Sequence, residues 1–218
     1  MGEKRNSVRA CLIIGAAPCT STDYINEFKL KTDCVICADG GESIAKSCGI
    51  TPDYWIGDGD SLGCDTSVSN KVILPCEKDY TDLHCAVDLG LKLGYQRFYL
   101  CAVSGGRLDH FLANLCLLEY LESQGAIGIL ADAQNLCMLH HGQEMAFERN
   151  PSYQYVSLIP LDEQIRGVTL SGLKYSLNDA VLERKLPIGV SNEPIADRFS
   201  IRVDFGRALI VFSKDVSK

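Results

Sequence analysis

The sequence lacks any apolar run close to the roughly 18 residues that a membrane-spanning helix needs. It also lacks a surplus of basic residues, because 21 Lys and Arg are opposed by 28 Asp and Glu, which gives a net charge of −7. A nucleic-acid-binding protein normally presents a basic face, so this balance argues against that class. We find no internal repeat and no low-complexity linker, and the polar residues 1–9 do not lead into a signal-peptide pattern. We therefore expect a cytoplasmic globular protein that binds neither nucleic acid nor membrane.

The chain has 218 residues, which is enough for one large domain or two small ones with a substantial core. Eleven of them are cysteines, a high and odd number. One Cys-x-x-Cys motif is present, Cys34 to Cys37, and it falls inside an expected strand with no second pair to complete a zinc site. Others, such as Cys11, Cys101 and Cys116, also lie in apolar stretches. We interpret them as free thiols that pack as small hydrophobes in a reducing compartment.

Strand-length apolar runs alternate with helical patterns through the first 133 residues. The predicted strands are 10–16, 33–38, 72–75, 97–103 and 127–131, and the predicted helices are 23–30, 42–48, 82–93 and 108–122. Such alternation predicts an α/β domain with a buried parallel sheet and helices on both faces. Ligands bind beyond the carboxyl ends of the strands in sheets of this kind, and that is where the charged segments of this sequence lie.

After about residue 140 the pattern changes to alternating polar and apolar residues. Segments 153–161, 167–177, 181–186 and 199–214 read as strands, with turn signals at Gly167, Asn178-Asp179 and Asp204 to Gly206. The pattern predicts an all-β sandwich. We place the α/β domain at residues 1–141 and the β domain at 142–218.

Asp58 and Asp60 follow the short apolar stretch Tyr54 to Ile56, which stops at Gly57. Alternate residues of a regular strand face opposite ways, so the glycines must turn the chain for both carboxylates to converge. Such a pair suits Mg²⁺, which binds through one or two carboxylates and takes further ligands from nucleotide phosphates. An ordinary polar turn is the alternative.

Two further segments place charged or glycine residues at the start of a helix. Gly40 and Gly41 follow Asp39 between a strand and a helix, where backbone N–H groups can approach a phosphate, although a tight turn is as good an explanation. Lys78 to Asp82 begin the next long helix. Either Asp79 or Thr81 caps that helix, or Asp82 is a third metal ligand and Lys78 contacts a phosphate.

Residues 104–114 carry the strongest signal. Gly105 and Gly106 feed a helix that starts with Arg107, an arrangement suited to a triphosphate held by backbone amides and a guanidinium fork. At about 100° per residue, Arg107, His110 and Asn114 share one polar stripe, and Asp109 reaches a common ligand only from the first turn. Next to it we expect a buried stripe, formed by Leu108, Phe111, Leu112, Leu115 and Leu118.

These segments, in this order and at these spacings, resemble the thiamine pyrophosphokinase family. The matching motifs are Ala-Asp-Gly-Gly at 38–41, Pro-Asp-Tyr-Trp-Ile-Gly-Asp-Gly-Asp-Ser at 52–61, Lys-Asp-Tyr-Thr-Asp at 78–82, and Gly-Gly-Arg-Leu-Asp-His-Phe-Leu-Ala-Asn at 105–114. In the β domain they are Gly-Val-Thr-Leu-Ser-Gly-Leu-Lys-Tyr-Ser-Leu at 167–177 and Gly-Val-Ser-Asn-Glu at 189–193. The likeness covers nearly the whole chain.

The resemblance implies an enzyme that moves a pyrophosphoryl group from ATP to the hydroxyethyl oxygen of thiamine, giving thiamine diphosphate and AMP. It also implies a homodimer with each site between subunits. By likeness, the Mg²⁺ ligands are Asp58, Asp60 and Asp82. The candidates for the ATP site are Asp39, Gly40, Gly41, Lys78, Asp79, Thr81, Gly105, Gly106, Arg107, Asp109, His110 and Asn114. Ser191, Asn192 and Tyr175 would face thiamine, and many relatives carry Trp where Tyr175 stands.

The residue types agree with that chemistry, because metal and Arg107 supply the electrostatic stabilisation on which phosphoryl transfer depends. Either Asp60 or Asp82 could take the proton from the alcohol, and the sequence does not choose between them. Two rivals remain open. One is a diphosphokinase that acts on another alcohol such as a pterin, and the other is a nucleotide-binding relative without catalysis.

Overall fold

A computed structural model describes residues 8–58, 68–75, 77, 79–142 and 144–216 of the chain. It divides into two compact units, residues 1–133 and 134–218. The division falls eight residues before the expected boundary at 141/142. The reason is β7 (Asn135–Leu139), which pairs with a strand near the C-terminus, β13 (Ala208–Ser213), and so belongs to the second unit.

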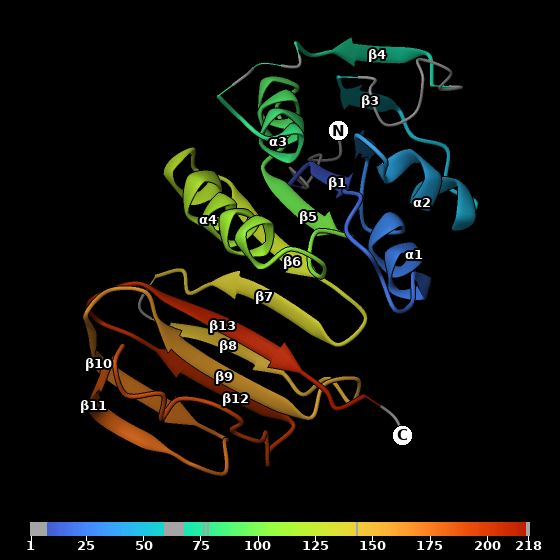
Figure 1. Ribbon diagram of the computed structural model, residues 1–218. Coiled ribbons are helices and arrows are strands. Elements are labelled where there is room, and N and C mark those ends of the chain that lie inside the picture. Colours follow the sequence, from blue (N-terminus) through green and yellow to red (C-terminus); the bar gives the residue numbers. More distant parts are fainter. Residues whose placement is uncertain (1–7, 59–67, 76, 78, 143, 217–218) are drawn as a thin grey trace, which may run out of the picture. The chain divides into compact units, whose positions relative to one another are not determined.

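The first unit has a sheet of six parallel strands in its described part, in the order β4-β3-β2-β1-β5-β6 (Figure 1). Their bounds are β1 Ala10–Ile14, β2 Cys34–Ala38, β3 Tyr54–Gly57, β4 Asn70–Ile73, β5 Arg97–Cys101 and β6 Ile127–Ala131. Every residue of β1 and β2 is buried, as expected for central strands covered on both faces. The strand order reverses at β1, because the chain builds outward to β4 and then returns to the other side of β1 as β5.

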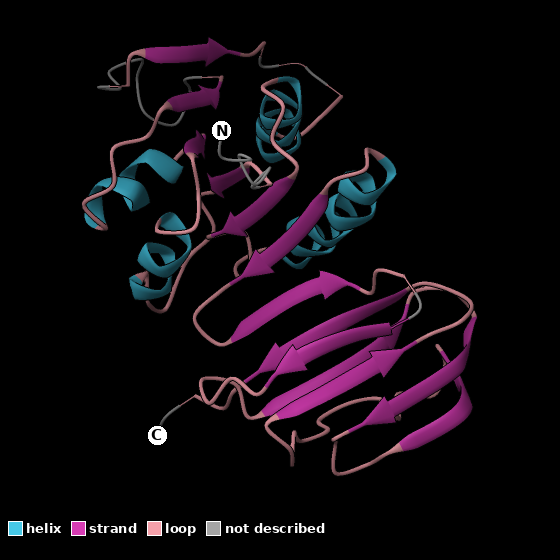
Figure 2. Ribbon diagram, turned by 180° about the vertical axis from the view of Figure 1, so that it is seen from behind, coloured by secondary structure: helices cyan, strands magenta, loops and turns pink. Residues whose placement is uncertain are grey.

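This reversal sends the helices to opposite faces. Helices α1 (Asp23–Lys29) and α2 (Gly41–Ser47) lie on one side of the sheet, and α3 (Asp82–Lys92) and α4 (Leu108–Ser123) lie on the other (Figures 1 and 2). The prediction of a parallel sheet with helices on both faces is therefore confirmed. None of the described helices is both long and apolar enough to cross a membrane.

Two details of the first unit differ from expectation. The stripe predicted on α4 is wrong for Leu108 and Leu112, which are 68% and 52% exposed, whereas Leu118 is buried as predicted and Phe111 and Leu115 are partly buried. A helix of 16 residues is about 24 Å long, whereas a strand of five spans about 17 Å, so α4 is longer than the strands it covers, and its exposed leucines lie in its first two turns. Cys116, in the middle of α4, is an exposed thiol rather than a buried one.

The second difference is β4, which we expected to be a buried strand. It is an edge strand paired on one side with β3, and Ile73 is 61% exposed. An edge strand has a neighbour on one side only, so its apolar side chains need not be covered.

The second unit consists, in its described part, of two antiparallel sheets (Figure 1). One has the order β7-β13-β9, with β9 at Tyr155–Pro160. The other has the order β11-β10-β12-β8, with β8 Glu144–Glu148, β10 Gln164–Ser171, β11 Leu177–Glu183 and β12 Arg198–Arg202. Side chains from both sheets, among them Val156, Ile201 and Ile210, form one core. The predicted all-β sandwich is confirmed.

Of the three turns predicted in this unit, one is a turn in the structure and two lie inside strands. The turn at Asp204 to Gly206 joins β12 to β13 as expected. Gly167 and Asp179, however, lie inside β10 and β11, where the pairing of these strands shifts register. Both residues have positive φ, so the turn signals in the sequence mark β-bulges instead.

Candidate functional site

The first unit contains a cleft of ≈ 520 Å³ at the carboxyl ends of β1 and β5. These are the neighbouring strands at which the strand order reverses, and open α/β sheets bind ligands at this switch point. Eight of the predicted site residues line it: Asp39, Thr81, Asp82, Gly105, Gly106, Arg107, His110 and Asn114.

One wall of the cleft was missed by the sequence analysis. Residues 15–18, Gly-Ala-Ala-Pro, follow β1 and line the cleft. The Gly15 N–H donates to the Cys101 carbonyl oxygen at 2.9 Å, and the Ala17 N–H donates to that of Ala102 at 2.9 Å. The segment carries no charge, and its only signal was that it follows the first strand of an alternating α/β pattern.

The glycine pair faces this wall. Gly105 and Gly106 have φ values of +98° and +70°, which glycine adopts without strain. A Cβ on Gly105 would lie 2.6 Å from the Pro18 carbonyl oxygen, so a side chain cannot fit there. The pair therefore lets the segment after β5 pack closely against the segment after β1.

Arg107 is the N-cap residue of α4, and its guanidinium forms a fork with Asp109 at the edge of the cleft. Arg107 Nε donates to Asp109 Oδ1 at 3.1 Å, and Nη2 donates to Oδ2. Hydrogen bonding from Arg107 lowers the pKa of Asp109 to about 2. Asp109, which we predicted to contact ATP, does not line the cleft and instead pairs with Arg107.

His110 and Asn114 line the cleft with Arg107, so the predicted polar stripe is brought together. The Asn114 amide nitrogen donates to the Val103 carbonyl oxygen at 2.8 Å. This bond ties α4 to the end of β5, which gives Asn114 a part in shaping the cleft.

Two carboxylates face the same cleft from other elements. Asp39 follows β2 with φ +47°, its N–H donates to the Ile56 carbonyl at 2.8 Å, and its own carbonyl accepts from Trp55 Nε1 at 2.9 Å. Asp82 is in the first turn of α3, next to Thr81. Thr81 caps that helix by accepting from the His84 N–H at 3.2 Å, so the capping interpretation of this segment is correct for Thr81.

Gly40 and Gly41 do not line the cleft. Gly41 is buried, and a Cβ there would clash with the Ile14 carbonyl oxygen and lie 2.9 Å from that of Gly15. The glycine at position 41 is thus explained by the close approach of α2 to the end of β1.

The expected metal ligands are only partly visible. Asp82 lines the cleft, Asp58 comes directly after β3 and is not among the lining residues, and Asp60 lies outside the described residues, as does Lys78. Asp79 is described but does not line the cleft either. Over the described ranges, no three His, Cys, Asp or Glu side chains are grouped closely enough to hold a metal ion.

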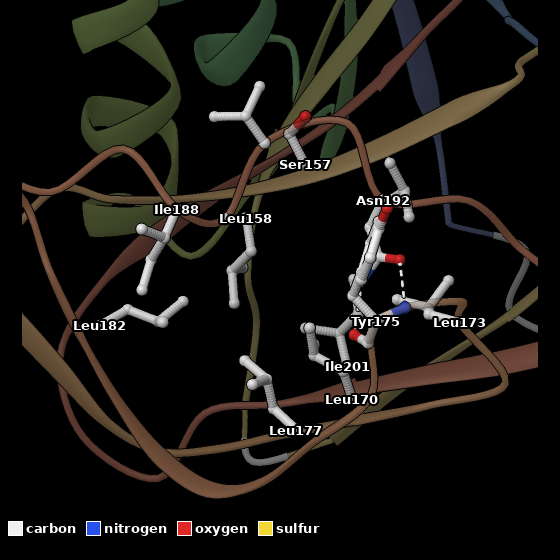
Figure 3. Close-up of a pocket in the computed structure, with 13 residues that line it drawn as sticks. Ser157, Leu158, Leu170, Leu173, Tyr175, Leu177, Leu182, Ile188, Asn192 and Ile201 are labelled. Atoms are coloured by element: carbon white, nitrogen blue, oxygen red, sulfur yellow. Dashed lines mark hydrogen bonds between the residues drawn. The ribbon is translucent and has the colours of Figure 1, made fainter.

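The second unit has a smaller pocket of ≈ 100 Å³ with mostly apolar walls (Figure 3). Leu158, Leu177, Leu182 and Ile188 surround it, and Tyr175 lies on the opposite side, 62% exposed. The apolar residues of the wall were not predicted as site residues, because in the sequence they look like ordinary inward-facing strand positions.

Asn192 lines this pocket but uses its amide to hold the chain around Tyr175. Its Oδ1 accepts from the N–H groups of Tyr175 and Glu193, both at 2.9 Å, and its Nδ2 donates to the Tyr175 carbonyl at 2.8 Å (Figure 3). Asn192 is only 7% exposed. Three of the four hydrogen bonds that an amide side chain can make are therefore committed to the protein.

Ser191 is next to the pocket without lining it. It has φ +58°, and its N–H donates at 3.0 Å to the hydroxyl of Ser157, which does line the pocket. Of the three residues expected to face thiamine, Tyr175 and Asn192 are therefore brought together, and Ser191 supports the turn between them and β9.

The chain therefore combines an α/β unit that has a polar cleft at its switch point with an all-β unit that has a mostly apolar pocket, and each hollow is a candidate small-molecule site. Residues 25–129 match the family model described as thiamin pyrophosphokinase, catalytic domain, and residues 143–210 match thiamin pyrophosphokinase, vitamin B1 binding domain.

Known relatives agree with these matches. Thiamine pyrophosphokinase of Bacillus subtilis (strain 168) is 32% identical over 201 residues, which are 89% of this chain and 92% of the relative. The crystal structure of thiamine pyrophosphokinase from Bacillus subtilis superimposes with a TM-score of 0.86 at 28% identity, covering 95% of this chain and 100% of that one. The corresponding structure from Geobacillus thermodenitrificans has a TM-score of 0.83 at 27% identity, covering 95% and 99%.

The chain belongs to the thiamine pyrophosphokinase family, and it is an enzyme of the pyrophosphotransferase class. The family resemblance found in the sequence motifs is confirmed.

Proposed function

We propose that this chain is a Mg²⁺-dependent thiamine diphosphokinase, which transfers pyrophosphate from ATP to thiamine and releases AMP. The observation that carries the proposal is the pairing of two different sites in one chain. A polar cleft suits a nucleoside triphosphate, and a separate apolar pocket with an exposed aromatic ring suits an organic cation. The two sites lie in the two units that match the catalytic and the vitamin B1 binding domains.

For ATP, we propose that the phosphates lie along the glycine segment after β5. Backbone amides at Gly105 and Gly106 are suited to phosphate oxygens, and Arg107 supplies a fork of donors. Since the guanidinium is paired with Asp109, phosphate binding would exchange one anionic partner for another. His110 and Asn114 would contact the nucleotide from the same side.

For Mg²⁺, we propose Asp58, Asp60 and Asp82 as ligands. The donor chemistry fits, because Mg²⁺ prefers oxygen ligands and two carboxylates, Asp39 and Asp82, face the cleft. When bound, the ion supplies positive charge that neutralises the phosphate oxygens.

For thiamine, we propose the pocket of the second unit. Its apolar wall would take the ring system, and Tyr175 would stack on the cationic thiazolium, an interaction worth about 0.5–2 kcal/mol. The Lys174 ammonium lies 5.7 Å from the centre of the Tyr175 ring and is paired with Glu193 at 2.7 Å. That ion pair partly compensates the lysine charge, which reduces the repulsion that a cationic ligand would meet there.

In the proposed reaction, the hydroxyethyl oxygen of thiamine forms a bond to the β-phosphorus of ATP. The bond from that phosphorus to the bridging α–β oxygen breaks, and AMP leaves with the electron pair. The hydroxyl proton goes to a carboxylate, Asp60 or Asp82. Arg107 stabilises the charge that builds on the transferred group.

The test is a turnover assay with ATP, Mg²⁺ and thiamine, in which AMP and thiamine diphosphate are measured together. Asp82→Asn should lower kcat by about 10²-fold or more, since it removes charge from the reacting centre. Asp88→Asn, on the same helix and away from the cleft, is the matched control and should turn over as the wild type does. Equal rates for Asp82→Asn and the wild type would contradict the role given to Asp82.

A binding assay, read together with the turnover assay, separates the two rival functions. Calorimetry with thiamine and with a pterin alcohol, each beside a non-hydrolysable ATP analogue, shows which acceptor binds. A preference for the pterin would favour a different diphosphokinase, and nucleotide binding without turnover would favour a non-catalytic relative.

We further propose that the enzyme is a cytoplasmic homodimer whose sites lie between subunits, as the family resemblance implies. The nine described cysteines are all free thiols, which suits a reducing compartment. Mixing inactive Asp82→Asn with a Tyr175→Ala variant that binds thiamine poorly tests the shared site. Recovered activity is expected if each site takes residues from both chains, and no recovery would contradict it.

A further inference from the structure

Ala102 is in a conformation that an alanine rarely adopts. It directly follows β5, it is fully buried, and its φ is +54°. For residues other than glycine this left-handed region is strained, so the surrounding structure must hold it in place. The chain turns here toward Gly105, Gly106 and Arg107, which line the nucleotide cleft.

Both peptide groups of Ala102 are held by hydrogen bonds to other segments. Its N–H donates at 3.0 Å to the hydroxyl oxygen of Tyr24, a residue of α1 that is 78 positions earlier in the chain. Its carbonyl oxygen accepts at 2.9 Å from the N–H of Ala17, in the other wall of the cleft. Ala102 therefore connects α1 with two of the segments that line the cleft, those after β1 and after β5.

Tyr24 is itself held in place. Its ring packs edge-on against Phe28, with centroids 6.5 Å apart. Burial raises the pKa of Tyr24, so the hydroxyl keeps its proton and remains a neutral partner. Tyr24 does not line the cleft and falls in none of the motifs that identify the family.

We propose that Tyr24 is a positioning residue for nucleotide binding, because its hydroxyl fixes the left-handed turn at Ala102 and thereby the glycine segment that receives the triphosphate. The inference rests on the proposed ATP site and adds a residue to it. It concerns affinity for the nucleotide, and thiamine binding in the second unit should be unaffected.

The test is Tyr24→Phe, which keeps the ring and its packing and removes only the hydroxyl. We measure the Kd for a Mg²⁺-bound non-hydrolysable ATP analogue by calorimetry, and the KM for ATP and kcat by turnover. We expect Kd and KM to rise about tenfold, equivalent to about 1.4 kcal/mol, with a smaller change in kcat. Tyr120→Phe is the matched control. It also removes one part-buried tyrosine hydroxyl, which donates to Asp88 Oδ1 at 2.6 Å, and neither residue lines the cleft.

A rescue experiment separates positioning from general stability. Glycine adopts positive φ freely, so in an Ala102→Gly background the turn does not need the Tyr24 hydrogen bond to hold it. Adding Tyr24→Phe to that background should therefore change the Kd by less than about twofold. The inference is overturned if Tyr24→Phe lowers only the melting temperature and leaves Kd unchanged. It is also overturned if the loss of affinity is as large in the Ala102→Gly background.

Failure of the proposed function gives a different result. A wild-type chain that binds no ATP analogue would refute the ATP site and this inference with it. Wild-type binding together with normal binding by Tyr24→Phe would refute the inference alone.

Discussion

Asn192 offers a prediction in which stability and substrate binding can be separated. Its amide makes three hydrogen bonds to the backbone around Tyr175, and the Tyr175 ring is the proposed platform for thiamine. Asn192→Ala should therefore both destabilise the second unit and release the ring from its position. Tyr175→Ala should remove the ring and keep all three backbone bonds.

The magnitude follows from the groups left without partners. Asn192→Ala leaves two N–H groups and one carbonyl oxygen without their hydrogen-bond partner, and each such group costs about 1–3 kcal/mol if it stays buried. Because the Tyr175 segment is partly exposed, water replaces some of these bonds, and we expect a total loss of about 2–4 kcal/mol. Tyr175→Ala should cost less than about 1 kcal/mol, since the ring is 62% exposed.

The assay combines urea unfolding with calorimetric titration of thiamine. Both single variants should weaken thiamine binding by about tenfold, the size of one cation–π contact. If Asn192 acts through Tyr175, the double variant should bind thiamine no worse than either single variant. Additive losses in the double variant, with no loss of stability in Asn192→Ala, would refute the reasoning and show that Asn192 contacts thiamine directly.

Two further predictions follow from contacts in the first unit. Gly41→Ala should lower the free energy of unfolding by about 1–3 kcal/mol, because the new methyl group would meet the Ile14 carbonyl oxygen. Gly40→Ala is the control and should lower it less, so equal urea midpoints for the two variants would contradict this. In an NMR titration, Arg107→Lys should raise the pKa of Asp109 from about 2 toward its usual value, because the bidentate fork is lost. A depressed folded-state pKa contributes stability above the unfolded value and loses it as pH falls through about 2, so an unchanged Asp109 pKa would contradict the pairing.

Much of the first unit could be predicted from sequence because its strands are continuous apolar runs. β1 and β2 are buried throughout, and a parallel sheet covered on both faces needs no polar alternation. Where only part of an element is covered, the pattern failed. On α4, Leu108 and Leu112 continue the apolar spacing into exposed turns of the helix, and the sequence does not show which turns are covered.

The candidate site was predictable where charged residues or a glycine pair mark it, and it was missed where the lining is apolar or uncharged backbone. Arg107, His110 and Asn114 were predicted from their polar side chains and their helical spacing, and they line the cleft together. The wall at 15–18 has no such signal, and neither has Tyr24, whose contact with Ala102 joins residues 78 positions apart. Long-range backbone contacts of this kind depend on the tertiary fold, which periodicity alone does not give.

Product analysis tests the central claim most directly. The purified chain, supplied with Mg²⁺, ATP labelled at the β-phosphorus and thiamine, should yield AMP and thiamine diphosphate in equal amounts, with the label in the thiamine product. Formation of ADP, or of AMP without labelled thiamine diphosphate, would contradict the proposed pyrophosphoryl transfer.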